Sequence, residues 1–204
     1  MIAIVDYGMG NIKAFADVYK KLNIPAVIVR SARELENAGK IILPGVGSFD
    51  YVIKRIEESG MRSILDDVVI HRHVPVLGIC MGMQIFAFSS EEGNLPGLGW
   101  INGKVKRLTS SSREHPISVP HMGWNNAKPV NANAIFQGLD SDARFYFLHS
   151  YYFECDNHHD VMAFTEYGGD FASAVNSGNI YGVQFHPEKS HQWGIKLLEN
   201  FARL

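Results

Sequence analysis

The chain has 204 residues, of which 46% are hydrophobic and 20% are charged, and its formal net charge is -2. These values are ordinary for a globular protein, and the charge gives no electrostatic reason to expect nucleic acid or an anionic membrane as a partner. The N-terminal apolar run ends at Asp6, too early for a signal peptide, and no apolar stretch approaches the roughly 18 residues of a membrane span. We therefore expect a cytoplasmic protein with a single domain over residues 1–204.

The first half of the sequence alternates short apolar runs with segments of helical periodicity. The runs expected to form buried strands are residues 2–5, 26–29, 41–43 and 74–77. Apolar residues recur at helical spacing in residues 12–22, 49–56, 61–70 and 81–88. Continuous apolar strands separated by helices indicate an α/β domain with a mostly parallel central sheet that helices cover on both faces.

The second half, from about Gly99, consists of short β-like runs separated by Gly, Asn and Ser turns. The expected strands lie in residues 100–108, 144–154, 161–166, 171–175 and 180–185. A closing helix is expected over residues 191–201, and the most loop-like segment is 109–114. The pattern therefore predicts β-rich additions to the parallel sheet within one domain.

A cysteine follows the last apolar run of the first half, in the segment Gly78-Ile-Cys-Met-Gly82. Glycines on both sides of Cys80 are typical of a nucleophile elbow, with cysteine in the place that serine holds in many hydrolases. A thiol at the start of a helix lies at the positive end of the helix dipole, which favours the reactive thiolate. The backbone N–H of Met81 would point to the same place and is a candidate oxyanion donor.

A candidate base follows a later apolar run, in the segment Gln184-Phe-His-Pro-Glu188. If the strand continues, the side chains of His186 and Glu188 fall on the same face because they are two residues apart. A histidine that takes the thiol proton, beside a carboxylate that fixes its tautomer, would complete a catalytic set with Cys80.

Each of these motifs also has a plainer interpretation. Free cysteines are among the most buried residue types, so Cys80 could be an inert core residue. The His186-Pro-Glu188 segment could be an ordinary surface turn. The presence of both motifs, each after an apolar strand, favours a site, because parallel α/β sheets bind ligands outside the carboxyl ends of their strands.

The two motifs together resemble those of the class I (triad) glutamine amidotransferases, whose fold is flavodoxin-like. Further segments resemble the glutaminase subunits of imidazole glycerol phosphate synthases: Asp6-Tyr-Gly-Met-Gly-Asn11, Pro44-Gly-Val-Gly-Ser-Phe49, Pro120-His-Met-Gly-Trp-Asn125 and Leu148-His-Ser-Tyr-Tyr152. The resemblance runs from Met1 to about Phe201. It implies hydrolysis of L-glutamine to glutamate and ammonia.

Carried over residue by residue, the resemblance assigns a role to each matching position. It implies Cys80 as nucleophile, His186 as general acid and base, and Glu188 as the residue that orients the histidine. The positions that match the family's oxyanion site are Val46, Gly47 and Met81. Those that match its glutamine-binding residues are Gly47, Gln84, Glu92, Ser150 and Tyr151.

The resemblance also implies a partner. In this family the ammonia passes to a (β/α)₈-barrel cyclase of the HisF type, which forms a heterodimer with the glutaminase and functions in histidine biosynthesis. Asn11, His121 and Trp124 match residues at the partner interface, although Trp124 could be a core residue and Asn11 an ordinary helix start. We expect no metal and no organic cofactor, and low glutaminase activity until the cyclase binds.

Other functions remain open from the sequence alone. The stretch Lys189-Ser-His-Gln-Trp-Gly194 departs from the usual continuation of the biosynthetic subunit, as a paralogue supplying ammonia to a surface-polysaccharide sugar amidotransferase would. A cysteine peptidase would share the elbow but has no need of Gln84 and Glu92. A non-catalytic binding protein has no reason to keep an intact triad.

The remaining histidines and the second cysteine show no sign of a metal site. His71 and His73, like His158 and His159, lie in polar surroundings without cysteines at ligand spacing, and we expect solvated surface side chains. Cys155 lies between two acidic residues, lacks a basic neighbour, and is expected to be structural.

Overall fold

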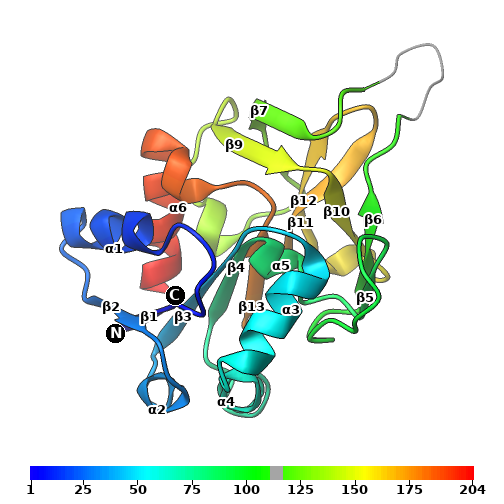
Figure 1. The fold of residues 1–204 in the computed structure, drawn as a ribbon. Coiled ribbons are helices and arrows are strands. Elements are labelled where there is room, and N and C mark those ends of the chain that lie inside the picture. Colours follow the sequence, from blue (N-terminus) through cyan, green and yellow to red (C-terminus); the bar gives the residue numbers. More distant parts are fainter. Residues whose placement is uncertain (111–116) are drawn as a thin grey trace.

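The computed structural model of the chain describes residues 1–110 and 117–204, and Figure 1 shows its fold. The strands of its main sheet are β1 (Ile2–Val5), β2 (Ala26–Val29), β3 (Lys40–Gly45), β4 (Val76–Cys80), β5 (Ser89–Ser90), β6 (Gly103–Arg107), β8 (Lys128–Pro129), β10 (Tyr151–Cys155), β11 (Val161–Glu166), β12 (Asp170–Ser177) and β13 (Ile180–Val183). Their order is β2-β1-β3-β4-β13-β12-β10-β6-β5, with β11 paired to β12 and to β8. A separate antiparallel pair is formed by β7 (His121–Asn126) and β9 (Arg144–His149).

The helices are α1 (Ile12–Lys21), α2 (Ala32–Leu35), α3 (Phe49–Glu58), α4 (Arg62–Asp66), α5 (Met81–Gln84) and α6 (His191–Arg203). A π-helical turn, η1 (Asp67–His71), continues α4, and short 3₁₀ turns form η2 (Ala134–Phe136), η3 (His158–Asp160) and η4 (Pro187–Lys189). Within the described residues, no helix has the length and apolar character needed to cross a membrane.

Helices cover both faces of the parallel part of the sheet, as the apolar runs predict (Figure 1). Along β1, Ile2 and Ile4 pack into one hydrophobic cluster, which includes residues of α1 and α6. Ala3 and Val5 point the other way, into a cluster that includes residues of α3 and α4. A strand that is buried on both faces needs apolar residues at every position, which explains its unbroken run.

The site-bearing strands end at the same edge of the sheet. Strand β4 pairs in parallel with β3 on one side and with β13 on the other. Gly45 is in register with Cys80, and Ile79 with Val183. The segments that follow these strands therefore meet where parallel sheets bind ligands.

Three local predictions are wrong. The helix expected over residues 81–88 ends at Gln84, because the carbonyls of Ile85 and Phe86 accept hydrogen bonds from Leu98 and Trp100. Residues 61–70 form not one helix but α4 followed by the π-helical turn. The segment 121–126, which is not among the expected strands, is strand β7, since it pairs along its whole length with β9. The loop-like segment predicted at residues 109–114 lies mostly outside the described residues.

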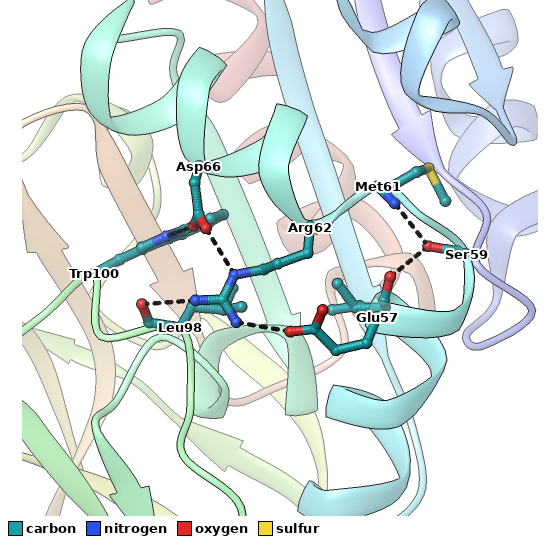
Figure 2. A network of polar contacts seen from close by, with 8 residues as sticks. Glu57, Ser59, Met61, Arg62, Asp66, Leu98 and Trp100 are labelled. Atoms are coloured by element: carbon teal, nitrogen blue, oxygen red, sulfur yellow. Dashed lines mark hydrogen bonds and ion pairs between the residues drawn. The ribbon is translucent and has the colours of Figure 1, made fainter.

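A polar network holds the loop after α5 against α4, and Figure 2 shows it. Arg62 donates a hydrogen bond of 2.8 Å to Asp66 and another of 3.4 Å to the carbonyl of Leu98. Trp100 donates from its indole to Asp66 at 2.7 Å, and its ring stacks on Phe86 with centroids 5.1 Å apart. The loop that follows α5 is thus fixed to α4 by residues far apart in the sequence.

Candidate active site

Cys80 occupies the turn between β4 and α5, with φ 54° and ψ -111°. A positive φ is rare for a residue with a side chain and marks a strained turn. The flanking glycines are required by close packing: a Cβ on Gly82 would collide with the carbonyl oxygen of Leu43, and one on Gly78 would lie 2.6 Å from the carbonyl oxygen of Gly82. The elbow predicted from the sequence is confirmed.

The helix after Cys80 is shorter than predicted. With only residues Met81–Gln84 in α5, the dipole behind the thiol comes from a single turn. The stronger positive influence on the sulfur is His186, which is hydrogen-bonded to Cys80. The positive charge near the thiol therefore comes mainly from the histidine and not from the helix dipole.

His186 and Glu188 form a pair, although not by the geometry expected. Strand β13 ends at Val183, and Pro187–Lys189 turns as a 3₁₀ helix instead of continuing the strand. The imidazole Nδ1 still lies 3.0 Å from Oε1 of Glu188, and both side chains are buried. Cys80, His186 and Glu188 thus stand in one hydrogen-bonded line.

The backbone around His186 is fixed by its neighbours. The N–H of His186 donates to the carbonyl of Tyr146 at 2.8 Å, and Ser190 donates from its hydroxyl to the carbonyl of His186 at 2.6 Å. Ser190 also accepts a hydrogen bond of 3.0 Å from the N–H of Tyr146. The backbone that carries the imidazole is therefore held at both its N–H and its carbonyl.

The charge state of His186 follows from these contacts. Burial disfavours the imidazolium, but the hydrogen bonds to Cys80 and Glu188 outweigh it and raise the pKa of His186 to about 10. At neutral pH the ring is then protonated. A cationic imidazolium beside a thiol favours the thiolate, the form that attacks carbonyl carbon.

A cavity of about 340 Å³ opens above the sulfur. Its lining includes Cys80 and His186 and all the positions matched to glutamine binding, Gly47, Gln84, Glu92, Ser150 and Tyr151. The oxyanion candidates Val46 and Met81 line it as well. The volume falls within the range of small-molecule sites, roughly 300–1,000 Å³. The structure thus brings together residues that are up to 140 positions apart in the sequence, from Val46 to His186.

Two of the polar residues in the cavity are also bound to the protein itself. Glu92 accepts a hydrogen bond of 2.8 Å from the N–H of Phe49, and burial raises the pKa of its carboxyl group. Gln84 donates from Nε2 to the carbonyl of Tyr151 at 2.8 Å. Both side chains are therefore held in place by the protein's own backbone.

The end of β3 and the residues after it lie opposite the sulfur, and this segment is tightly packed at its start and exposed at its end. The hydroxyl of Tyr7 donates to the carbonyl of Pro44 at 2.5 Å, and Gly45 packs so closely on the start of α5 that a Cβ would collide with Gly82. Beyond Gly45 the pairing with β4 stops, Val46 is exposed, and Gly47 has φ +98°. Only the second of the two glycines thus has the left-handed conformation that favours glycine.

The residues predicted to face a partner have different surroundings. Asn11 is exposed at the start of α1 and makes no capping hydrogen bond with its side chain. Trp124 is 37% exposed and stacks on His191, with ring centroids 5.1 Å apart. His121 is only 3% exposed, because its ring packs inward against Tyr167. The His121 ring therefore faces inward, and its place at the partner interface stays a prediction.

His121 instead takes part in a buried histidine pair that sequence reasoning missed. Its Nδ1 lies 3.0 Å from Nε2 of His149, whose Nδ1 lies 2.8 Å from the carbonyl of Tyr151. Burial lowers the pKa of His121 to about 4 and that of His149 to about 3, so both rings are neutral. The pair connects β7 to the backbone that lines the cavity.

The other residues considered for metal binding lie away from the cavity. The four histidines at 71, 73, 158 and 159 are exposed, as expected. Cys155 is half-buried, and burial together with neighbouring acids raises the pKa of its thiol to about 12. Over residues 1–110 and 117–204 there is no group of three or more His, Cys, Asp or Glu side chains able to hold a metal ion.

Comparison with known proteins identifies the class that this fold and site define. The family described as glutamine amidotransferase class-I matches residues 3–204, and the chain belongs to it. The imidazole glycerol phosphate synthase subunit HisH of Bdellovibrio bacteriovorus is 56% identical over 204 residues, which are 100% of both chains. The same subunit of Leptospira interrogans is 53% identical, again over 100% of both chains. Within its class, the chain is thus a member of the HisH family.

Solved structures share the fold at much lower identity. A putative GMP synthase subunit from Thermoplasma acidophilum has a TM-score of 0.72 and 21% identity, covering 99% of this chain and 92% of that one. The structure of PurLQS from Thermotoga maritima has a TM-score of 0.70 and 18% identity, covering 99% and 97%. These similarities show the α/β fold of the class.

Proposed function

We propose that the chain is the glutaminase subunit of an imidazole glycerol phosphate synthase. It hydrolyses L-glutamine to glutamate and ammonia and passes the ammonia to a HisF-type cyclase in histidine biosynthesis. Residues 1–204 act as one glutaminase domain. The observation that carries the proposal is the line from Cys80 through His186 to Glu188 at the floor of the cavity.

In the first step the Cys80 thiolate attacks the side-chain amide carbon of glutamine. The C–N bond then breaks, the departing nitrogen takes the proton of the His186 imidazolium, and ammonia leaves behind a glutamyl thioester. The raised pKa of His186 supports this role, because the ring holds a proton ready for the leaving group.

In the second step the neutral His186 takes a proton from water, which attacks the thioester. The C–S bond breaks, and glutamate and the Cys80 thiolate are released. Glu188 accepts from Nδ1 of the imidazole, at 3.0 Å, and so keeps Nε2 as the nitrogen that exchanges protons. Glu188 also stabilises the imidazolium each time it forms.

The negative oxygen formed in both steps needs hydrogen-bond donors. Met81, next to the nucleophile, supplies one from its backbone, and Val46 and Gly47 on the opposite segment supply the other. Glu92 attracts the α-ammonium group of the substrate, while Gln84, Ser150 and Tyr151 complete the cavity around its polar groups. These assignments follow from the lining of the cavity and from the family resemblance.

The partner docks beside the mouth of the cavity. Trp124, Met122 and Leu148 are exposed apolar residues of the β7–β9 pair, and Met122 and Leu148 are direct cross-strand neighbours. Exposed apolar side chains that gather in one place mark interaction sites. Leu148 also lines the cavity, so a cyclase on this face would receive ammonia without its release into water.

The test is glutamate release from glutamine by the purified chain, alone and with the cyclase plus its nucleotide ligand. We expect slow release from the chain alone and stimulation of roughly 100-fold in the complex, the upper part of the usual range of coupling between sites. Glutamate release that ignores the cyclase would refute the proposed partner. A chain that releases no glutamate under either condition would refute the glutaminase.

A further inference from the structure

A second amide lies beside the nucleophile and has no part in the mechanism above. Gln184 is 0% exposed and stands two residues before His186, at the end of β13. Its Nε2 lies 3.6 Å from Sγ of Cys80, within hydrogen-bond range for sulfur. Its Oε1 lies 2.9 Å from Nε2 of Gln84. The side chain therefore bridges the cavity residue Gln84 and the nucleophile.

The amide of Gln84 fixes the orientation of the Gln184 amide, because the orientation of Gln84 is itself set by a carbonyl group. Gln84 points its Nε2 to the carbonyl of Tyr151 at 2.8 Å, and a carbonyl has no hydrogen to donate. The atom of Gln84 nearest to Gln184 is thus a donor, so Gln184 must present its oxygen there. The remaining end of the amide, the N–H, is the end that faces the sulfur.

We propose that Gln184 is a further catalytic residue, whose side-chain N–H donates to Cys80 and stabilises the thiolate. The inference rests on the proposed function and deepens it. The amide is neutral and keeps its hydrogens throughout, so it adds a donor to the sulfur without changing the proton balance of either step. Hydrogen bonds to charged groups are the strong ones, and they favour the charged form of the acceptor.

Three other groups act on the sulfur and set the background for a test. His186 is hydrogen-bonded to it, and Tyr7 interacts with it electrostatically but stays neutral, because burial raises the pKa of its hydroxyl. The carbonyl of Leu148 lies 3.9 Å away and can accept only from the protonated thiol. His149 acts electrostatically on His186 rather than on the sulfur, and it is neutral because burial lowers its pKa to about 3. Gln184 is the uncharged donor in this set.

The test is the pH profile of Cys80 alkylation by iodoacetamide, followed by mass spectrometry so that Cys80 and Cys155 are counted separately. Replacing Gln184 by methionine keeps the shape of the side chain and removes the donor. We expect the midpoint of the profile to rise by about one pH unit, which is about a tenfold loss of rate on its acid side. In the complex with the cyclase, kcat for glutamine should fall about tenfold on the acid side of its pH profile, with little change in KM.

The matched control is Asn200→Leu, which removes a buried amide far from the sulfur. Asn200 lies on α6 and donates to the carbonyls of Ile135 and Gln137, at 3.1 and 2.7 Å. We expect this variant to lower the melting temperature while leaving the alkylation midpoint unchanged. A shift in both variants would show that the profile reports loosened packing and would overturn the proposal.

A second variant covers the case in which Gln184→Met does not fold. Gln184→Glu keeps an acceptor for Gln84 but turns a carboxylate oxygen to the sulfur, and should move the midpoint further upward. A folded variant of either kind with the wild-type profile overturns the proposal. The outcome is separate from that of the proposed function, because alkylation requires neither glutamine nor cyclase.

Discussion

Cys80 and His186 are 7% and 4% exposed, whereas Val46, across the same cavity, is 39% exposed. We call the first side the nucleophile wall, formed by residues 78–84 and 184–188, and the second the oxyanion wall, formed by residues 44–48. On the nucleophile wall, the sulfur, the imidazole and the carboxylate hold one another by hydrogen bonds. On the oxyanion wall, pairing with the sheet stops at Gly45.

The two walls differ in how much conformational freedom the protein leaves them. Close packing around Gly78 and Gly82 leaves the nucleophile wall no room to change. Gly47, by contrast, holds φ +98°, a region that glycine enters and leaves without steric penalty. A partner that regulates the enzyme would therefore act more readily on the oxyanion wall than on the nucleophile wall.

The largest expected effect comes from removing the sulfur. Cys80→Ala should lower glutamine hydrolysis by about 10⁴-fold or more, since the covalent step is lost. Synthesis driven by added ammonia in the reconstituted complex should survive, because the cyclase does not use the nucleophile. Loss of both activities in a folded variant would contradict the assignment of Cys80.

The next largest effect is expected from removing the charge of Glu188. Glu188→Gln is expected to lower kcat by about 10²- to 10⁴-fold, because the imidazolium loses its orienting carboxylate. Glu188 raises the pKa of His186, so the variant should also lose activity at a lower pH as the pH increases. A pH–rate profile of kcat measures both effects. An unchanged alkaline limb would mean that another group sets the charge of His186.

A pair of glycine variants compares the two walls directly. Gly82→Ala should unfold the protein or destabilise it by more than about 3 kcal/mol, because its Cβ collides with the carbonyl of Leu43. Gly47→Ala has Cε of Met9 as its nearest neighbour at 3.2 Å and should cost only about 1–2 kcal/mol of backbone strain. Thermal melting measures both.

The same two glycine variants distinguish an effect on packing from an effect on regulation by the cyclase. Gly47→Ala should keep wild-type alkylation of Cys80 but show weaker stimulation of glutamate release by the cyclase. Equal destabilisation by the two substitutions would contradict the distinction between the walls.

The smallest expected effect is on substrate binding. Glu92→Gln should raise KM for glutamine about tenfold with little change in kcat, because it removes a charge that attracts the substrate in ground and transition states alike. Burial raises the pKa of Glu92, so the wild-type KM should increase as the pH falls through that pKa and the carboxylate is neutralised. The variant should lack this increase, and a variant that retains it would exclude Glu92 as its source.

The parts of the molecule that depend on local patterns could be predicted from the sequence. The apolar runs predict β1, β3 and β4, because strands buried on both faces are apolar throughout, and they also predict the partly buried edge strand β2. The glycines around Cys80 predict the elbow, because the tight turn at Cys80 leaves no room for side chains at the flanking positions.

The parts of the molecule that depend on contacts between distant residues could not be predicted from the sequence. Helix α5 ends early because a loop more than ten residues away binds the carbonyls of the two residues that follow it, and β7 forms because β9 pairs with it. The His186–Glu188 pair was predicted from a strand that turns out to be a 3₁₀ turn. The orientation of the Gln184 amide depends on its hydrogen bond with Gln84, 100 positions away in the chain.

The most direct test of the account measures two rates on the same protein, with and without the cyclase and its nucleotide ligand. One is alkylation of Cys80 by iodoacetamide, which needs only the nucleophile wall, and the other is glutamate release, which needs both walls. We expect glutamate release to rise roughly 100-fold while alkylation changes by less than about twofold. A parallel rise in both rates would show that the partner assembles the nucleophile wall, and would contradict the account.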